Sequence, residues 1–251
     1  MTARSPSGVT VLLAHLGVER RQVPAVCLII AMFEVTIVGL AVVQAFLERA
    51  FHWPPTVVFI LFWVVWTWWH SWLFPRHRLR YLEHARNPYR RAFIRDIYPW
   101  VSAGFSQMWR PLINGDTLDR LLGGRLTLDP WALSIGMVVC FAALLIMVLA
   151  IRTIGIGNAA FLREFVAADT FVPIDTGIYS AIMHPLFWAG IAYSCGLAIA
   201  VSTRQSYAIA AINVVYGILY IRLENRRLAR IFGSRYESYR ARTASVIPWL
   251  R

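Results

Sequence analysis

Long apolar runs are the feature of this sequence that most restricts its fold. A helix needs about 20 consecutive apolar residues to cross the hydrocarbon core of a bilayer. Five stretches reach or approach this length, namely residues 24–47, 55–74, 131–151, 186–201 and 206–221. The last two are separated by the short polar turn Ser202, Thr203, Arg204 and Gln205, which predicts a tight helical hairpin. The expected fold is therefore all-α: a polytopic transmembrane helical bundle of five to six membrane segments.

Composition supports this fold class and excludes others. Hydrophobic residues make up 58% of the 251 residues and charged residues only 15%, whereas soluble domains have roughly 45–50% and about 25%. A disordered chain and an ordinary cytosolic domain are thereby excluded. The formal net charge is +12, from 25 basic and 13 acidic residues. All 25 basic residues are arginines, and they lie between and beyond the apolar runs. There they set topology and meet anionic lipid headgroups, so we expect membrane lipids and no nucleic acid as partners.

Cysteine and lysine usage narrows the possible chemistry. Without lysine, no Schiff-base or other catalytic lysine is possible. Cys27, Cys140 and Cys195 each lie inside an apolar run, where thiols are usually inert small hydrophobes. The sequence contains no CxxC, no zinc-type Cys/His spacing and no HExxH, so we expect no metal site.

The connection between the second and third runs leaves the number of crossings open. Residues 76–95 contain seven arginines interleaved with apolar and aromatic side chains, which predicts a basic amphipathic helix or loop on the membrane surface. Residues 97–113 are moderately apolar but include Pro99, Gln107 and Arg110. If they form a sixth crossing, 20 of the 25 arginines lie on one side, and that side is the cytoplasm by the positive-inside rule. The rule favours six crossings, with a re-entrant or surface helix as the alternative.

Two further features concern how the apolar runs end and where they meet the membrane interface. The second run carries Trp63, Trp66, Trp68, Trp69 and Trp72, which we interpret as an aromatic belt at the membrane interface. Residues 155–160 read GxGxxA, but they follow a long apolar run rather than a short strand, which indicates the end of a membrane helix.

Glu34 lies near the middle of the first run. A carboxylate there is either a substrate-site residue or a group that is protonated or paired, with His70 or with an arginine.

The segment 176–185, which enters the fourth run, is the first cluster of polar residues with possible chemistry. It ends in His184-Pro185, and proline suits the first turn of a helix while restraining the preceding residue to extended backbone. The imidazole of His184 is thus expected beside the free N–H groups of a helix start, which suit a carboxylate or hydroxyl of a ligand. The alternative is that His184 is only an interfacial cap.

A second cluster lies on the last apolar helix. Asn213, Tyr216, Tyr220 and Glu224 recur at spacings of three and four and therefore share one face. A polar stripe on a spanning helix faces the bundle interior or a wet cavity. The alternative for Glu224 is a simple ion pair with Arg227 or Arg222. Further along, Gly233 is a typical residue for the end of a helix.

These segments resemble two motifs of one enzyme superfamily, the isoprenylcysteine carboxyl methyltransferases and phospholipid methyltransferases. Residues 176–189 resemble TGxYxxxRHPxYxG, and residues 224–248 resemble EExxLxxxFGxxYxxYxxxVPxxxP. Five positions match in the first motif and eight in the second: Thr176, Gly177, Tyr179, His184 and Pro185, then Glu224, Leu228, Phe232, Gly233, Tyr236, Tyr239, Val246 and Pro248. Residues 152–155 also resemble the Arg-x-Leu-Gly that often follows the preceding span. The resemblance covers roughly the last hundred residues.

The resemblance implies a membrane methyltransferase that uses S-adenosylmethionine, bound at the cytoplasmic end of the hairpin under a polar C-terminal cap. The implied cofactor-binding residues are Thr176, Gly177, Tyr179, His184, Pro185, Tyr220 and Glu224. Such chemistry requires no catalytic side chain. The chain is then divided into an N-terminal membrane region, residues 1–130, and a methyltransferase-like core, residues 131–251. The acceptor is expected to be a lipid or a small hydrophobic molecule, with Glu34, Arg222 and Asn213 as candidate substrate residues.

The sequence departs from the motifs at four positions. Met183 stands where the family has arginine, Phe187 replaces tyrosine, Ala189 replaces glycine and Asn225 replaces the second glutamate. Arg222 is the arginine nearest in sequence that could substitute for the missing one. Two alternatives follow: a degenerate, non-catalytic ligand-binding member of the family, and an NADPH-dependent membrane reductase of the steroid 5α-reductase type, whose C-terminal region has a similar pattern.

Overall fold

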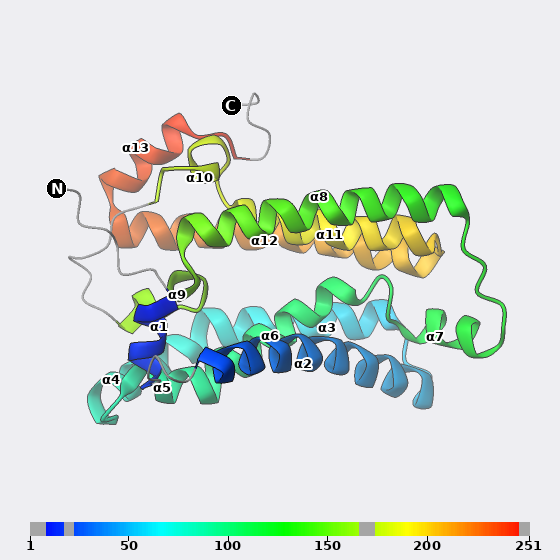
Figure 1. The fold of residues 1–251 in the computed structure, drawn as a ribbon, viewed down its shortest axis with the longest axis horizontal. Helices are drawn as coiled ribbons and strands as arrows, with labels where there is room; N and C mark the ends of the chain where they lie inside the picture. The colour runs from blue at the N-terminus through cyan, green and yellow to red at the C-terminus, as the bar shows by residue number, and fades with distance from the viewer. Residues whose placement is uncertain (1–8, 18–22, 166–173, 246–251) are drawn as a thin grey trace.

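The computed structural model describes residues 9–17, 23–165 and 174–245, and long helices dominate it. Within these residues there is no β-strand, and one isolated parallel bridge joins Ile182 to Ala244. Figure 1 shows an upper layer of α8 (Pro130–Ile154), α11 (Pro185–Val201) and α12 (Arg204–Phe232). A lower layer contains α2 (Val23–Ala50), α3 (Pro55–Trp68) and α6 (Tyr98–Ser106). The predicted all-α bundle is confirmed.

The apolar runs have become the long helices. Among the described residues, four helical segments are long and apolar enough to cross a membrane, Ala31–Ala50, Pro55–His84, Pro130–Ile154 and Arg204–Arg230, and α11 is a shorter apolar helix. The predicted hairpin turn is shorter than expected. Only Ser202 and Thr203 connect α11 to α12, because the Thr203 side chain accepts from Ser206 N at 3.1 Å and caps α12.

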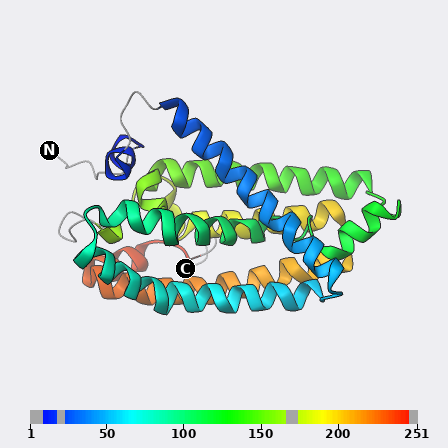
Figure 2. The same ribbon diagram turned by 90° about the horizontal axis from the view of Figure 1, so that it is seen from below.

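A sixth segment also runs the length of the bundle. It begins with α5 (Pro88–Ala92), passes through a π-helical turn (Phe93–Ile97) into α6, and ends in a 3₁₀ turn (Gln107–Trp109). At one end, Tyr81 donates to Asp96 Oδ2 at 2.6 Å. At the other end, Pro111 O accepts from Ser206 Oγ at 2.6 Å. The two ends of the segment thus lie at opposite ends of the bundle, as six crossings require (Figures 1 and 2).

The low hydropathy of this sixth segment has a physical cause. Its polar side chains are turned into the protein: Ser102, Ser106, Gln107 and Arg110 are each at most 1% exposed. Gln107 Nε2 donates to Gln44 Oε1 at 3.2 Å, and Arg110 forms an ion pair with Glu48 in which neither side chain is exposed. Polar groups on a spanning helix are tolerated in this position because protein partners replace water.

Two π-helical turns bend the lower layer. The turn Trp69–Leu73 joins α3 to α4 (Phe74–His84), and the turn Phe93–Ile97 joins α5 to α6. Pro75 and Pro99 follow these turns at the second residue of the next helix. Proline has no N–H to donate, so the regular hydrogen-bond ladder is interrupted just before it. The basic stretch 76–95 is mostly helical: it lies in α4, in α5 and in the start of the second π-helical turn, with a break between α4 and α5.

The two ends of the bundle differ in charge. One end, called here the arginine-rich end, holds the basic helices α4 and α5, together with α9 (Ile156–Ala159), α10 (Ile178–Ala181) and α13 (Ser234–Arg242); α1 (Val9–Leu16) contacts α5 and α9. The other end, called here the Glu48 end, holds α7 (Gly115–Leu122). Figure 2 shows α2 crossing the other helices obliquely toward the Glu48 end.

Helices α8 and α11 pack more closely than any other pair in the described part of the chain. Gly136 and Gly196 allow this approach. A Cβ on Gly196 would lie 2.7 Å from Cys140 Sγ and 2.9 Å from Gly136 O, closer than real side chains come. Small residues at helix crossings are typical of membrane bundles. Cys140 is buried in this crossing, whereas the side chain of Cys27 lies outside the described residues.

The tryptophans of α3 and its π-helical turn do not form a single interfacial belt. Trp66 and Trp69 are 8% and 0% exposed, and Trp63 stacks on Tyr216 of α12 with ring centroids 4.0 Å apart. Only Trp68 and Trp72 are exposed, at 50% and 44%. The belt prediction was wrong for three of the five residues, because helical periodicity turns Trp63 and Trp66 toward α12 and Trp69 toward Trp100 of α6, while the other two face outward.

Candidate functional site

His184 lies at the start of α11 in an unusual backbone conformation. Its φ and ψ are 58° and 41°, the left-handed region, so the expected extended conformation was wrong. Met183 N, one residue earlier, donates to Ala244 O at 2.8 Å, and Pro185 is the first residue of α11. The chain must therefore turn from this bridge into a helix within one residue. A non-glycine residue in this region stores strain of about 1–3 kcal/mol, which is typical of functional sites.

The imidazole of His184 has a defined proton position. Its Nε2 is 2.5 Å from Asn225 Oδ1, and Tyr236 OH donates to the same oxygen at 2.5 Å. Because an amide oxygen only accepts, His184 donates from Nε2 and leaves Nδ1 as an acceptor. Burial lowers the pKa of His184, although the hydrogen bond to Asn225 opposes the shift. His184 is therefore neutral at physiological pH.

The segment from α13 to residue 245 covers this part of the site. Tyr239 OH donates to Tyr179 O at 2.9 Å, and Trp188 Nε1 donates to Ser245 O at 2.9 Å. Burial raises the pKa of Tyr179 and of Tyr236 to about 12, so both phenols keep their protons. The C-terminal segment thus lies as a cap over residues 179–188. Val246 and Pro248 of the second motif lie outside the described residues.

The loop that precedes His184 lies over the end of α8. Gly177 has φ 56°, and a Cβ there would lie 2.9 Å from Thr153 Oγ1, so glycine is required for both reasons. Gly155, with φ 80°, ends α8 in the same way, and no strand precedes it; the GxGxxA pattern is the end of a membrane helix, as predicted. Thr176 is exposed, and its carbonyl accepts from Tyr179 N at 3.2 Å.

The polar stripe of α12 faces the bundle interior, as its spacing predicts. Asn213 Nδ2 donates to Ser194 Oγ at 2.7 Å, and Tyr216 OH is 2.9 Å from Thr67 Oγ1. One and two turns further on, Tyr220 and Glu224 are 5% and 6% exposed.

Tyr220 joins this stripe to two other elements. Its OH is 3.2 Å from His70 Nε2, on the π-helical turn after α3. Its ring lies 4.8 Å from that of Phe187, in the first turn of α11. The His184 and Glu224 clusters are therefore parts of one site.

Glu224 forms the centre of an ion-pair network at the arginine-rich end. Its Oε1 accepts from Arg163 Nη2 at 3.2 Å, and its Oε2 accepts from Arg227 Nη1 at 3.1 Å. Arg227 also pairs with Glu164, whose Oε2 lies 3.7 Å from Arg78 Nε. The pairing of Glu224 with Arg227 was one of the two sequence interpretations. Arg163, Glu164 and Arg78 carried no motif signal, and only the fold brings them to Glu224.

The four departures from the motifs are accommodated within this site. Met183 is 3% exposed and packs against Tyr236 and Tyr239 in a small apolar cluster. Asn225 accepts the two hydrogen bonds described above, and Phe187 lies against Tyr220. Ala189 is 1% exposed. Each replacement has a packed or hydrogen-bonded place.

Two of the predicted substrate residues lie elsewhere. Glu34 is exposed on α2, and no ion pair joins it among the residues that the structure describes. His70, one of its suggested partners, contacts Tyr220 instead. Arg222 is exposed on α12. Substrate contact by Glu34, Arg222 and Asn213 stays a prediction.

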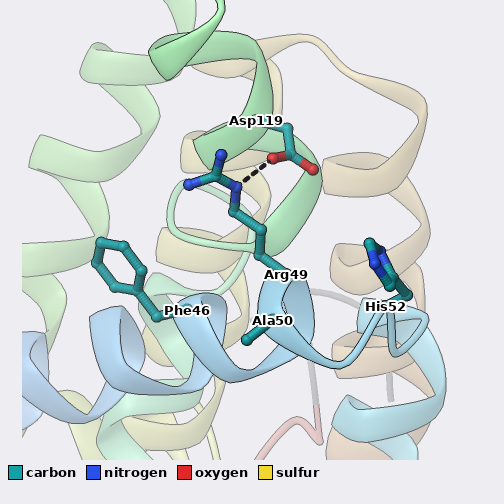
Figure 3. A pocket seen from close by; sticks show the side chains of 5 residues that line it. All are labelled: Phe46, Arg49, Ala50, His52 and Asp119. Atoms are coloured by element: carbon teal, nitrogen blue, oxygen red, sulfur yellow. Dashed lines mark ion pairs between the residues drawn. The ribbon is translucent and has the colours of Figure 1, made fainter.

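A hollow of about 390 Å³ lies between α2 and α7 at the Glu48 end of the bundle (Figure 3). Phe46, Arg49, Ala50, His52 and Asp119 line it, and Arg49 Nε lies 2.6 Å from Asp119 Oδ1. Both charged side chains are about half exposed, at 44% and 51%, so the hollow is an open surface feature. It contains none of the residues predicted from the motifs. Across residues 9–17, 23–165 and 174–245, no group of three or more His, Cys, Asp or Glu side chains could hold a metal ion.

The donor set at the arginine-rich end fits S-adenosylmethionine in its chemistry. Glu224 and Arg163 offer opposite charges in contact, which suits an amino-acid group. The rings of Tyr220 and Phe187 suit an aromatic base or a sulfonium cation. His184 Nδ1 is an acceptor for a hydroxyl or amino group.

Comparison with known proteins adds an independent line. A protein-family model described as phospholipid methyltransferase matches residues 131–235, from the start of α8 into α13. This range contains the first motif and the beginning of the second, so the resemblance inferred from the motifs is confirmed. No curated protein and no solved structure matches the chain at a significant level.

Proposed function

We propose that this chain, whose residues 131–235 belong to the phospholipid methyltransferase family, transfers a methyl group from S-adenosylmethionine to a lipid or small hydrophobic acceptor. One observation carries the proposal. The two motif segments, far apart in sequence, meet at one end of the bundle, where Asn225, next to Glu224, contacts His184. The family and the apolar spanning helices already establish the coarser statement, a methyltransferase-type membrane protein.

We assign cofactor binding to residues of both motifs. Glu224 binds the amino-acid or ribose end, and Tyr220 supplies an aromatic face beside it. His184 accepts a hydrogen bond through Nδ1. Thr176, Gly177, Tyr179 and Pro185 form the loop and helix start that hold His184 in place, through the contacts of Tyr179 with the C-terminal cap.

For an acceptor that is a thiolate, a carboxylate or a free amine, the mechanism requires alignment rather than proton transfer by the protein. The bound cofactor supplies an electrophilic methyl group on sulfur. The chain excludes water with the cap from α13 to residue 245 and holds neutral groups, His184 and Tyr236, next to the reacting region. The faces of the Tyr220 and Phe187 rings would stabilise a sulfonium cation electrostatically. Holding the acceptor and the methyl donor in ideal orientation can lower the activation barrier by roughly 7–11 kcal/mol.

The proposal includes the topology and the two-part organisation. The arginine-rich end faces the cytoplasm, following the positive-inside rule. The proposed division is an N-terminal membrane region, residues 1–130, and a methyltransferase-like core, residues 131–251; the contact between α3 and α12 supports the packing of their described parts against each other. The acceptor reaches the site from the lipid, which suits a hydrophobic substrate.

The test combines a product search with ligand binding. Protein in lipid nanodiscs is incubated with isotopically labelled S-adenosylmethionine and a lipid extract, and mass spectrometry searches for labelled products. Glu224→Gln and His184→Ala each remove one hydrogen-bonding group, so each should weaken S-adenosylhomocysteine binding by about 10–150-fold. Arg240→Met, an exposed change on α13, is the matched control.

Three outcomes separate the alternatives. A labelled lipid together with weakened binding in both variants supports the methyltransferase. Thermal stabilisation by NADPH but not by S-adenosylhomocysteine would identify the reductase. Stabilisation by neither ligand would favour a non-catalytic family member and refute the proposal.

A further inference from the structure

Arg163 contacts Glu224 although no motif assigns it a role. It lies on the 3₁₀ turn Leu162–Phe165, which follows α9. Its Nη2 is 3.2 Å from Glu224 Oε1, and its side chain is 25% exposed against 7% for Glu224. The guanidinium therefore reaches the site from its accessible side, whereas the carboxylate lies inside.

The charges around Arg163 are not balanced in the described part of the chain. Three guanidinium groups, of Arg78, Arg163 and Arg227, surround the two carboxylates of Glu164 and Glu224. Arg227 pairs with both carboxylates, whereas Arg163 Nε lies at 4.0 Å from Glu164. Within the described residues, Arg163 donates one hydrogen bond, to Glu224. An arginine has five N–H donors, so it retains capacity for an anion.

Arg163 also lies close to the first motif. Burial lowers the pKa of His184, and the charge of Arg163 lowers it further. Burial raises the pKa of Tyr179, and the charge of Arg163 opposes that rise. One guanidinium thus acts on residues of both motifs.

The motif itself no longer supplies an arginine. Met183 occupies that position, 3% exposed and packed against Tyr236 and Tyr239. Arg222, the nearest arginine to the site in sequence, is exposed on α12. Arg163 does not belong to α12, and the fold brings its guanidinium into contact with Glu224.

We propose that Arg163 binds the carboxylate of the methyl donor's amino-acid group and replaces the motif arginine lost at Met183. The proposal rests on the proposed function. An amino-acid group is a zwitterion, with ammonium and carboxylate on the same carbon. Arg163 and Glu224, held in contact, present the complementary pair of charges. Arg–carboxylate contacts are strong because two parallel N–H groups match the two oxygens.

The test compares two ligands that differ in this group. S-adenosylhomocysteine carries the amino-acid group, whereas 5′-methylthioadenosine keeps the adenosine and the thioether but lacks it. Dissociation constants for both are measured by calorimetry with the full chain in nanodiscs. The variants are Arg163→Met and Arg163→Lys, with Arg222→Met for comparison. Arg230→Met, an exposed arginine on α12, is the matched control.

Arg163→Met should weaken S-adenosylhomocysteine binding by about 10–150-fold and leave 5′-methylthioadenosine binding unchanged. Arg163→Lys should fall between, because an ammonium keeps the charge without the bidentate geometry. Equal losses for both ligands would mean that Arg163 only supports the fold, and this overturns the proposal. Unchanged affinity of Arg163→Met for S-adenosylhomocysteine would also overturn the proposal. A selective loss of S-adenosylhomocysteine binding in Arg222→Met, and not in Arg163→Met, would overturn it as well. If the wild-type protein binds neither ligand, the proposed function itself fails.

Discussion

The buried ion pair between Glu48 and Arg110 provides the sharpest test of how the sixth segment packs against α2. Neither side chain has any exposure, and the pair joins the end of α2 to the end of the sixth segment. Glu48 Oε2 also accepts from Gly115 N at 3.1 Å, and Arg110 Nη1 donates to Ile113 O at 2.7 Å. Replacing one partner with methionine leaves the other charge buried and unpaired.

Breaking such a pair costs about 3–5 kcal/mol. For a chain of this size, that corresponds to a fall in melting temperature of roughly 6–20 °C. The double variant Glu48→Met/Arg110→Met should lose much less than the sum of the single variants, because replacing a buried ion pair with apolar residues is often neutral. The exposed pair Arg49–Asp119 is the matched control, and Arg49→Met should cost at most about 1 kcal/mol.

The assay is thermal unfolding of the detergent-solubilised protein, with all variants measured under the same conditions. Coupling is the difference between the double variant and the summed single variants. Additive single effects would show that the two side chains do not interact, and the reasoning from burial and contact would be refuted.

Three further predictions follow from the described contacts. His184→Gly should be more stable than His184→Ala by about 1 kcal/mol in thermal unfolding, because only glycine adopts positive φ without strain; equal stability would contradict the left-handed backbone. Because burial lowers the folded-state pKa of His184, the wild type should lose stability as pH falls below about 6.5, where the unfolded state binds the proton first, and His184→Asn should lose less. In a cysteine-free background, Arg86→Cys and Asp116→Cys should be labelled from opposite faces of the membrane, and labelling from one face rules out the sixth crossing.

Much of the fold followed from the sequence because length and hydropathy determine a membrane helix almost alone. The third run is the clearest case: residues 131–151 were expected and Pro130–Ile154 is the helix. The interior face of α12 was also predictable, since Asn213, Tyr220 and Glu224 are polar on a spanning helix. Periodicity within one element is sufficient for such conclusions.

Features that depend on a partner element could not be predicted in this way. Periodicity places Trp68 and Trp69 on different faces, but which face is buried depends on the neighbouring elements that pack against the π-helical turn. Arg110 lowers the hydropathy of its segment, and its partner Glu48 is distant in sequence. Arg163 likewise reaches Glu224 only after folding. In each case the decisive contact is between residues far apart in the chain, for which no single-sequence pattern exists.

Two of the motif departures replace a charged residue with a neutral one. The family has a positive charge at position 183 and a negative charge at position 225, and this chain has Met183 and Asn225. Here Met183 packs against Tyr236 and Tyr239, whereas Asn225 lies between His184 and Tyr236. The amide of Asn225 still accepts both hydrogen bonds but carries no charge, so neutral His184 needs no counterion. The charged groups of this site are therefore those of Glu224 and its partners Arg163 and Arg227, and the proposed recognition of a zwitterionic ligand depends on them.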